Sequence, residues 1–207
     1  MKKFELTSEF NLNFFGRKFF RIKALVNIER YGVKAGDLGG WVEKEDNLSQ
    51  SGNAWVSGNA EVSGNAWVSG DAVVSGNAKV SGDAVVSGNA KVSGDAVVSG
   101  DAVVSGNAKV SGDAEVSGNA KVSGDAKVSG DADYAVIKGF GTVYRPTTFF
   151  RCHDGEVRVT CGCFYGTIDE FREQVKRTRK GKVADEYLKI ADLMEYHFKK
   201  EDSGENV

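Results

Sequence analysis

Residues 69–92 read SGDAVVSGNAKVSGDAVVSGNAKV, and this six-residue word, V-S-G-[N/D]-A-x, runs from Gly52 to Ser129 without insertion or deletion. Successive side chains of an extended strand point to opposite faces, so the Val and Ala of each word share one face. The residue x between them points the other way. The Ser-Gly-[Asn/Asp] triplet supplies turn residues, because Gly and Asn tolerate a positive φ. Short strands and corners therefore alternate along this stretch.

A period this strict predicts a solenoid. Three words make a triangular coil of 18 residues, and the fourteen words of residues 52–135 make between four and five coils. The predicted fold class is mainly β, a left-handed, single-stranded parallel β-helix. The period determines the coil length better than the hand, so a right-handed solenoid stays open as an alternative. A disordered linker does not need valine at every sixth position.

The outward residues x fall on three faces of this predicted coil. Residues 18 positions apart share a face. The first face carries Trp55, Val73, Lys91, Lys109 and Lys127, the second Glu61, Lys79, Val97, Glu115 and Asp133, and the third Trp67, Val85, Val103 and Lys121. The third face thus has an apolar row, Trp67-Val85-Val103. Contiguous exposed apolar surface often marks a protein contact, which makes these three residues candidates for self-association or partner binding. The alternative is that β-branched residues simply favour strands.

The chain divides into three predicted parts. Residues 1–51 form an N-terminal cap with a strand pair around Gly16-Arg17 and irregular first coils, in which Leu38, Val42 and Leu48 occupy coil positions. Residues 52–135 form the regular β-helix. Residues 136–207 form a C-terminal module. Caps are needed because an open sheet edge recruits other strands.

The C-terminal module is predicted to be a β-hairpin followed by two short helices. Asp154-Gly155 is a two-residue hairpin turn within an alternating stretch. Thr167 and Glu170 form a capping box that opens the first helix. The second helix is expected over residues 184–199, where apolar residues recur at helical spacing.

Cys152, His153, Cys161 and Cys163 suggest a zinc site. With the turn at Asp154-Gly155, Cys161 would lie opposite residue 148, about four residues from Cys152 along the sheet. That separation is too large for one tetrahedral ion, although a different hairpin register would reopen the zinc interpretation. Small buried cysteines on an apolar face are the preferred interpretation, and no metal or cofactor is expected.

A basic run lies between the two predicted helices, with Lys176, Arg177, Arg179, Lys180 and Lys182 around Gly181. Such a run can contact phosphates, but an exposed interhelical loop explains it equally well. The neighbouring repeat is mildly acidic, so nucleic acid is not favoured as a partner. The five residues are second candidates for partner binding. The repeat also mixes lysines with its aspartates, which gives little support to an inhibitor of a host nuclease or defence complex that imitates nucleic acid.

The 207 residues carry a net charge of -2, which gives no overall attraction to nucleic acid or membranes. The three cysteines are too few and too clustered for a disulfide framework, so a reducing cytoplasm is expected. We expect no signal peptide and no membrane span. Left-handed β-helices are often acyltransferases, but the two histidines, His153 and His197, lie outside the repeat. An acyltransferase-like enzyme is therefore an alternative and not the main prediction.

Two segments carry a resemblance to a known family. FFRIKAL…VKAGDLGGWVEKEDNLSQSGNAWV resembles the opening of hexapeptide-repeat proteins of phages, prophages and bacteria, and CGCFYGTIDEFREQV…EYLKIADLMEYHF is similar to the C-terminal region of many phage members. The resemblance implies a β-helix of the trimeric acyltransferase-like fold and no established activity. The resulting prediction is a non-enzymatic phage or prophage accessory protein in the host cytoplasm. Its β-solenoid would be a scaffold for self-association as a homo-oligomer, a dimer or trimer, or for binding a host protein.

Overall fold

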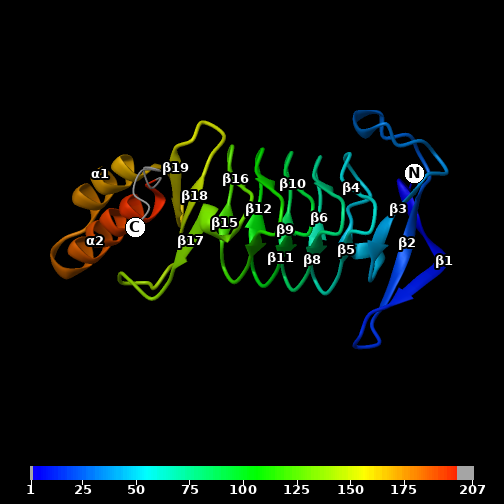
Figure 1. Cartoon of the computed structure of the whole chain (residues 1–207), viewed down its shortest axis with the longest axis horizontal. Helices are drawn as coiled ribbons and strands as arrows, with labels where there is room; N and C mark the ends of the chain where they lie inside the picture. The colour runs from blue at the N-terminus through cyan, green and yellow to red at the C-terminus, as the bar shows by residue number, and fades with distance from the viewer. Residues whose placement is uncertain (1, 200–207) are drawn as a thin grey trace, which may run out of the picture.

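A computed structural model describes residues 2–199 as an elongated molecule (Figure 1). An N-terminal hairpin lies at one end, a stack of coils in the middle, and an antiparallel sheet with two helices at the other end (Figure 1). The chain therefore has the predicted mainly β architecture, a parallel β-solenoid with a C-terminal sheet and helices. The left hand of its winding stays a prediction. Residues 200–207, which the predicted C-terminal module included, lie outside the described residues.

The coils are built from two-residue strands, one for each word of the repeat. They are β4 (Trp55–Val56), β5 (Glu61–Val62), β6 (Trp67–Val68), β7 (Val73–Val74), β8 (Lys79–Val80), β9 (Val85–Val86), β10 (Lys91–Val92), β11 (Val97–Val98), β12 (Val103–Val104), β13 (Lys109–Val110), β14 (Glu115–Val116), β15 (Lys121–Val122) and β16 (Lys127–Val128). Every third strand pairs in parallel, which gives the orders β4-β7-β10-β13-β16, β6-β9-β12-β15 and β5-β8-β11-β14. The predicted 18-residue coil is confirmed by this pairing. Asp133 is an exception, because it lies in the 3₁₀ turn η3 (Asp131–Asp133) and not on the second face.

The interior of the solenoid contains the Val and Ala of each word. From Val74 to Val128 every one of these side chains has 0% exposure. Burial of each valine contributes about 1.5–3 kcal/mol. Because the words repeat without insertion, these small side chains stack in register and form one continuous narrow core. The core is therefore continuous from one end of the solenoid to the other.

Glycine is required at the corners for two reasons. Gly100, for example, has φ of 67°, a left-handed conformation that other residues adopt at a cost. A Cβ at this position would also lie 3.0 Å from the backbone N and O of Gly118 in the next coil. The corner residue after each glycine adds a side-chain ladder, in which Asn107 donates to Asp125 across 3.0 Å and Asn77 donates to Asp95 across 2.9 Å.

The N-terminal strands extend one of the three sheets. Strand β3 (Leu38–Val42) pairs in parallel with β5, β2 (Lys18–Ala24) pairs antiparallel with β3, and β1 (Phe4–Leu12) forms the outer edge. The strand pair around Gly16-Arg17 is thus confirmed. Val42 and Leu48 are buried coil positions, but the same expectation for Leu38 is wrong because its side chain is 52% exposed. The short turns η1 (Glu29–Tyr31) and η2 (Glu45–Asn47) flank β3.

The C-terminal module has a larger sheet than the predicted hairpin. Its four antiparallel strands are β17 (Tyr134–Ile137), β18 (Thr147–Arg151), β19 (Val157–Cys161) and β20 (Phe164–Thr167). Helices α1 (Ile168–Thr178) and α2 (Gly181–Phe198) pack on it. The capping box of Thr167 and Glu170 is confirmed. The second helix begins three residues earlier than predicted, at Gly181, and ends at Phe198. We call β17–β20 with α1 and α2 the C-terminal cap.

Candidate self-association surfaces

The predicted apolar row lies on one flat sheet of the solenoid. Trp67 pairs with Val85 and Val85 with Val103, each in the next coil, and Lys121 follows. The three apolar side chains therefore stack in a line along the rod. Trp67 is 47% exposed, whereas Val85 and Val103 are half-buried. We call Trp67, Val85 and Val103 the exposed row.

Trp67 differs from the other two tryptophans in having no cover. Trp41 has 6% exposure and lies under the Arg21 guanidinium, 4.9 Å from the ring centroid. Trp55 has 3% exposure although it occupies an outward position. The segment containing Tyr31 packs over this face, and the Tyr31 hydroxyl donates to the Asp71 carbonyl. The exposed row thus lies on the face of the solenoid whose tryptophan side chain stays partly in solvent.

A second apolar surface lies on the N-terminal hairpin and was not predicted. Phe14 is 96% exposed and Phe15 is 87% exposed at the turn between β1 and β2. Phe10 and Leu12 on β1 are also exposed, by 46% and 61%. The hairpin extends past the outline of the coils (Figure 1). The sequence feature that could have predicted this surface is the pair Phe14-Phe15 next to a turn glycine. A hairpin turn at that point places both rings away from the hydrophobic core.

Strand β1 also presents a backbone edge, which is covered at Phe4, where the Gln50 side chain accepts from the Phe4 amide and donates to the Phe4 carbonyl. It is the outermost strand of its sheet, and its only strand partner among the described residues is β2. The register of the two strands shifts between Leu6 and Phe10, so β1 is irregular near its middle. Bulges of this kind protect an edge from uncontrolled pairing, which leaves the outer half with Phe10 and Leu12 as the more accessible part.

The opposite end of the solenoid is closed. Thr148 Oγ1 accepts a hydrogen bond from the Lys121 amide across 3.0 Å, and Thr160 Oγ1 donates to the Lys121 carbonyl across 2.9 Å. Cys152 forms an antiparallel bridge with Ala126, and Phe150 joins the solenoid core. The C-terminal cap thus satisfies backbone groups of the last coil. Another solenoid cannot stack on this end unless the cap moves.

The predicted basic loop is mostly helical. Lys176 and Arg177 belong to the last turn of α1, Lys182 belongs to α2, and only Arg179 and Lys180 connect the helices. The helical periodicity of the flanking residues continues into the run, so the expected loop is reduced to a tight corner. Lys176 pairs with Glu173 across 2.8 Å, and Lys182 approaches Glu186 to 3.8 Å. These pairs are exposed and contribute little to stability.

The three cysteines do not converge on one site. Cys161 pairs with Thr147 and not with residue 148, a shift of one residue from the predicted register. Cys152 is buried as expected, but Cys161 is half-buried and Cys163 is exposed, so the expectation of burial is wrong for Cys163. Burial raises the pKa of the Cys152 thiol to about 11, so it is protonated at neutral pH. Among residues 2–199, no group of three or more metal-ligating side chains comes together.

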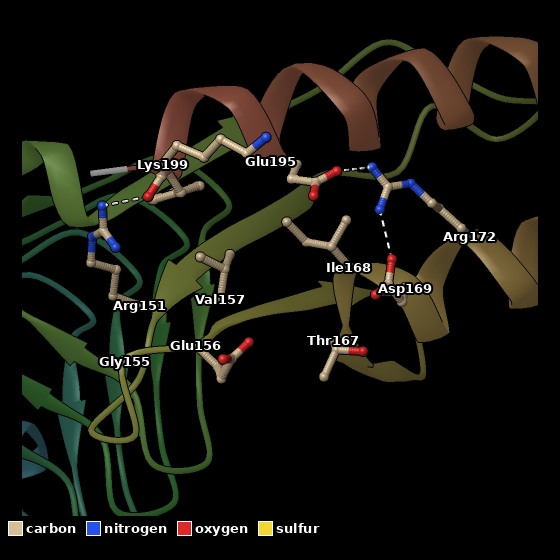
Figure 2. A pocket seen from close by; sticks show the side chains of 11 residues that line it. Arg151, Gly155, Glu156, Val157, Thr167, Ile168, Asp169, Arg172, Glu195 and Lys199 are labelled. Carbon is tan, nitrogen blue, oxygen red and sulfur yellow. Dashed lines mark hydrogen bonds and ion pairs between the residues drawn. The ribbon is translucent and has the colours of Figure 1, made fainter. Parts of the chain in front are cut away.

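A polar pocket of about 230 Å³ lies between the sheet and helices of the C-terminal cap (Figure 2). Arg151 and Arg172 stand on opposite sides of it (Figure 2). Arg151 donates to the Phe198 carbonyl across 2.8 Å. Burial acts to lower the pKa of Arg172, but hydrogen bonds to Glu195, to Asp192 and to Asp169 raise it. Because both guanidiniums are already bonded within the protein, this pocket is a structural junction and not a free binding site.

Comparison with known proteins connects the solenoid, but not the N-terminal hairpin of residues 4–24, to a family. No helix within residues 2–199 is both long and apolar enough to cross a membrane. No curated protein matches the chain. The family model for bactofilins, described as polymer-forming cytoskeletal proteins, matches residues 25–139, which include the whole regular solenoid. Since this match covers more than half of the 207 residues, the chain belongs to the bactofilin family of self-associating β-helix scaffold proteins.

Proposed function

We propose that this chain forms polymers through two apolar surfaces, the N-terminal hairpin and the exposed row. In this proposal the regular solenoid is the rigid spacer, the N-terminal hairpin supplies one contact, and the C-terminal cap closes the other end. The observation that carries the proposal is the exposure of Phe14 and Phe15, at 96% and 87%. Two nearly bare phenylalanines are costly in water, and contact with a second copy removes that cost.

The hairpin contact is expected to join two copies through the same surface. Lys18 Nζ lies 4.2 Å from the centroid of the Phe10 ring, so a cation covers part of that ring. Phe14 and Phe15 pack against each other edge to face with centroids 5.5 Å apart. They therefore present one compact aromatic knob and not two independent side chains. A second hairpin has the same knob and the same β1 edge to offer.

A polymer needs a second contact, because one surface that pairs only with itself closes into a dimer. The exposed row supports this role. It lies on a sheet of β6, β9, β12 and β15, whereas the hairpin extends the sheet that contains β3 and β5. The two surfaces therefore belong to different faces of the rod. If two copies join through their hairpins, and each of these dimers joins the next through the exposed row, the assembly is open-ended. The C-terminal cap then lies outside both contacts.

We also propose that the protein comes from a phage or prophage. The strings GDLGGW and GCFYGTIDEF support it through their resemblance to phage hexapeptide-repeat proteins. We propose that the scaffold acts in the cytoplasm of a host cell and presents its C-terminal cap to a host protein. Affinity purification from host lysate tests the role of the cap separately from polymer formation. It compares the full chain with a chain that lacks residues 136–207. Capture that survives the deletion contradicts the role given to the cap.

Light scattering after size-exclusion chromatography tests the two-surface arrangement. The wild type should elute as a concentration-dependent large species. A Phe14→Ser/Phe15→Ser variant and a Val85→Lys variant should each stop at a finite oligomer, and the combined variant should be a monomer. Val97→Lys is the matched control, because Val97 is a half-buried valine in the same position of another word. It lies on β11, in the sheet that the hairpin extends, and belongs to neither proposed contact. A combined variant with the mass of the wild type would refute the proposal.

A further inference from the structure

A second pocket of the C-terminal cap has unsatisfied positive charge. It has a volume of about 200 Å³ and lies between the loop that precedes β18, the β19–β20 turn and the α1–α2 corner. Its floor is apolar, with Phe164, Phe171 and Val175. Two guanidiniums line it, from Arg145 in the loop and Arg179 at the corner. Arg179 belongs to the basic run predicted from the sequence, whereas Arg145 lies more than thirty residues earlier and has no sequence signal.

Neither guanidinium is neutralised by the protein. Within residues 2–199, neither Arg145 nor Arg179 makes an ion pair with a carboxylate. Arg179 donates only weakly to the Thr178 carbonyl across 3.3 Å. Both arginines line the pocket together with the Tyr187 phenol. Burial and the neighbouring Cys161 raise the pKa of Tyr187, while Arg179 and Arg145 act to lower it. Two like charges therefore border one small cavity, an arrangement that an anion would stabilise.

The backbone next to Arg145 is strained. Tyr144 has φ of 51°, and it is the one residue other than glycine with a positive φ within residues 2–199. Such a conformation is unfavourable for residues other than glycine and tends to persist at functional sites. Tyr144 is 65% exposed, so its own side chain gains little packing in return. The residue that follows it, Arg145, lines the pocket.

We propose that this pocket binds a small ligand with an oxyanion, phosphate or carboxylate, attached to an aromatic or aliphatic group. Arg145 and Arg179 hold the oxyanion, because guanidiniums match its planar pairs of oxygens. The Nε2 of Gln174 is a further donor, since its Oε1 already accepts a bond from Arg177 across 2.6 Å. The apolar group lies on Phe164, Phe171 and Val175. The volume, below that of pockets for drug-sized molecules, limits the ligand to about one ring.

Isothermal titration of the full chain at low salt tests the pocket with phenyl phosphate, benzoate, inorganic phosphate and phenol. Phenyl phosphate or benzoate should bind, and which of the two binds more tightly identifies the oxyanion. Inorganic phosphate should bind more weakly, and phenol should not bind. Arg145→Gln and Arg179→Gln should each weaken binding by at least tenfold, which corresponds to about 1.4 kcal/mol. Lys180→Gln is the control, because Lys180 has the same charge next to Arg179 but does not line the pocket.

Thiol chemistry on the wild type gives a second readout that does not depend on the variants folding. Cys163 is exposed and lines the pocket, whereas Cys152 is buried elsewhere in the C-terminal cap. A saturating aromatic oxyanion should slow the modification of Cys163 by a thiol reagent, and phenol should leave the rate unchanged. The proposal is overturned if no aromatic oxyanion binds at millimolar concentration. It is also overturned if the two arginine variants bind as tightly as Lys180→Gln.

Discussion

The corners of the repeat require glycine for its left-handed backbone and for the close approach of the next coil. Two glycines at equivalent corners allow the energetic costs of these two effects to be measured separately. Gly100 and Gly118 have φ values of 67° and 64°, so alanine would be forced into the same left-handed backbone at either place. A Cβ at Gly100 would lie 3.0 Å from the N and O of Gly118, but a Cβ at Gly118 would have no atom within 4 Å. The two substitutions thus differ only in the contact with the next coil.

The size of each effect follows from this difference. The left-handed conformation costs an alanine about 1–2 kcal/mol, so Gly118→Ala should destabilise the fold by that amount. Gly100→Ala adds an overpacked contact against backbone, which costs about 1–3 kcal/mol more. For a chain of this size, each 1 kcal/mol lowers the melting temperature by about 2–4 °C. Gly100→Ala should therefore melt clearly below Gly118→Ala.

Thermal unfolding followed by circular dichroism in the β-sheet region measures the two variants beside the wild type. Urea titration provides the free energies of unfolding once two probes show that the repeat array unfolds in one transition. The interpretation of the corners would be refuted by equal losses in the two variants. Such a result would mean that the stacked coils separate easily at their corners.

Three further predictions concern the ends and the ladders. Burial lowers the pKa of Lys3 from 10.5 to about 8, and its ammonium donates to the Ala54 carbonyl. The folded state thus holds fewer protons than the unfolded state between those values, so the wild type should gain stability relative to Lys3→Met as the pH rises from 8 to 10.5, as denaturant titrations would measure. Asn77→Asp replaces a donor to Asp95 by a second carboxylate, and should cost about 1 kcal/mol that added salt partly restores in melting curves. Thr167→Ala removes the cap of α1 and should lower stability by about 0.5–2 kcal/mol without changing the oligomer mass.

The solenoid could be predicted because each word carries the same local information. The positions of Val85 and Val103 on one sheet follow from counting eighteens, and their pairing confirms the count. The same holds for Thr167 and Glu170, whose capping box acts over three residues. Where structure is determined locally and then repeated, the sequence is sufficient.

The ends could not be predicted to the same depth because their contacts are not local. Strand β17 pairs with β18 across a loop that has no regular pattern, so the four-stranded sheet had no signal beyond the Asp154-Gly155 turn. The exposure of Trp67 depends on where the segment around Tyr31 packs, which covers Trp55 instead. The pocket of Arg145 and Arg179 depends on the path of that same irregular loop.

Negative-stain electron microscopy of the purified chain tests the central claim most directly. If the hairpin and the exposed row join copies, wild-type particles should be many times longer than one rod, and the Phe14→Ser/Phe15→Ser variant should show only short particles. Isolated single rods for the wild type, at concentrations where the variant looks the same, would contradict the claim that these two surfaces build a polymer.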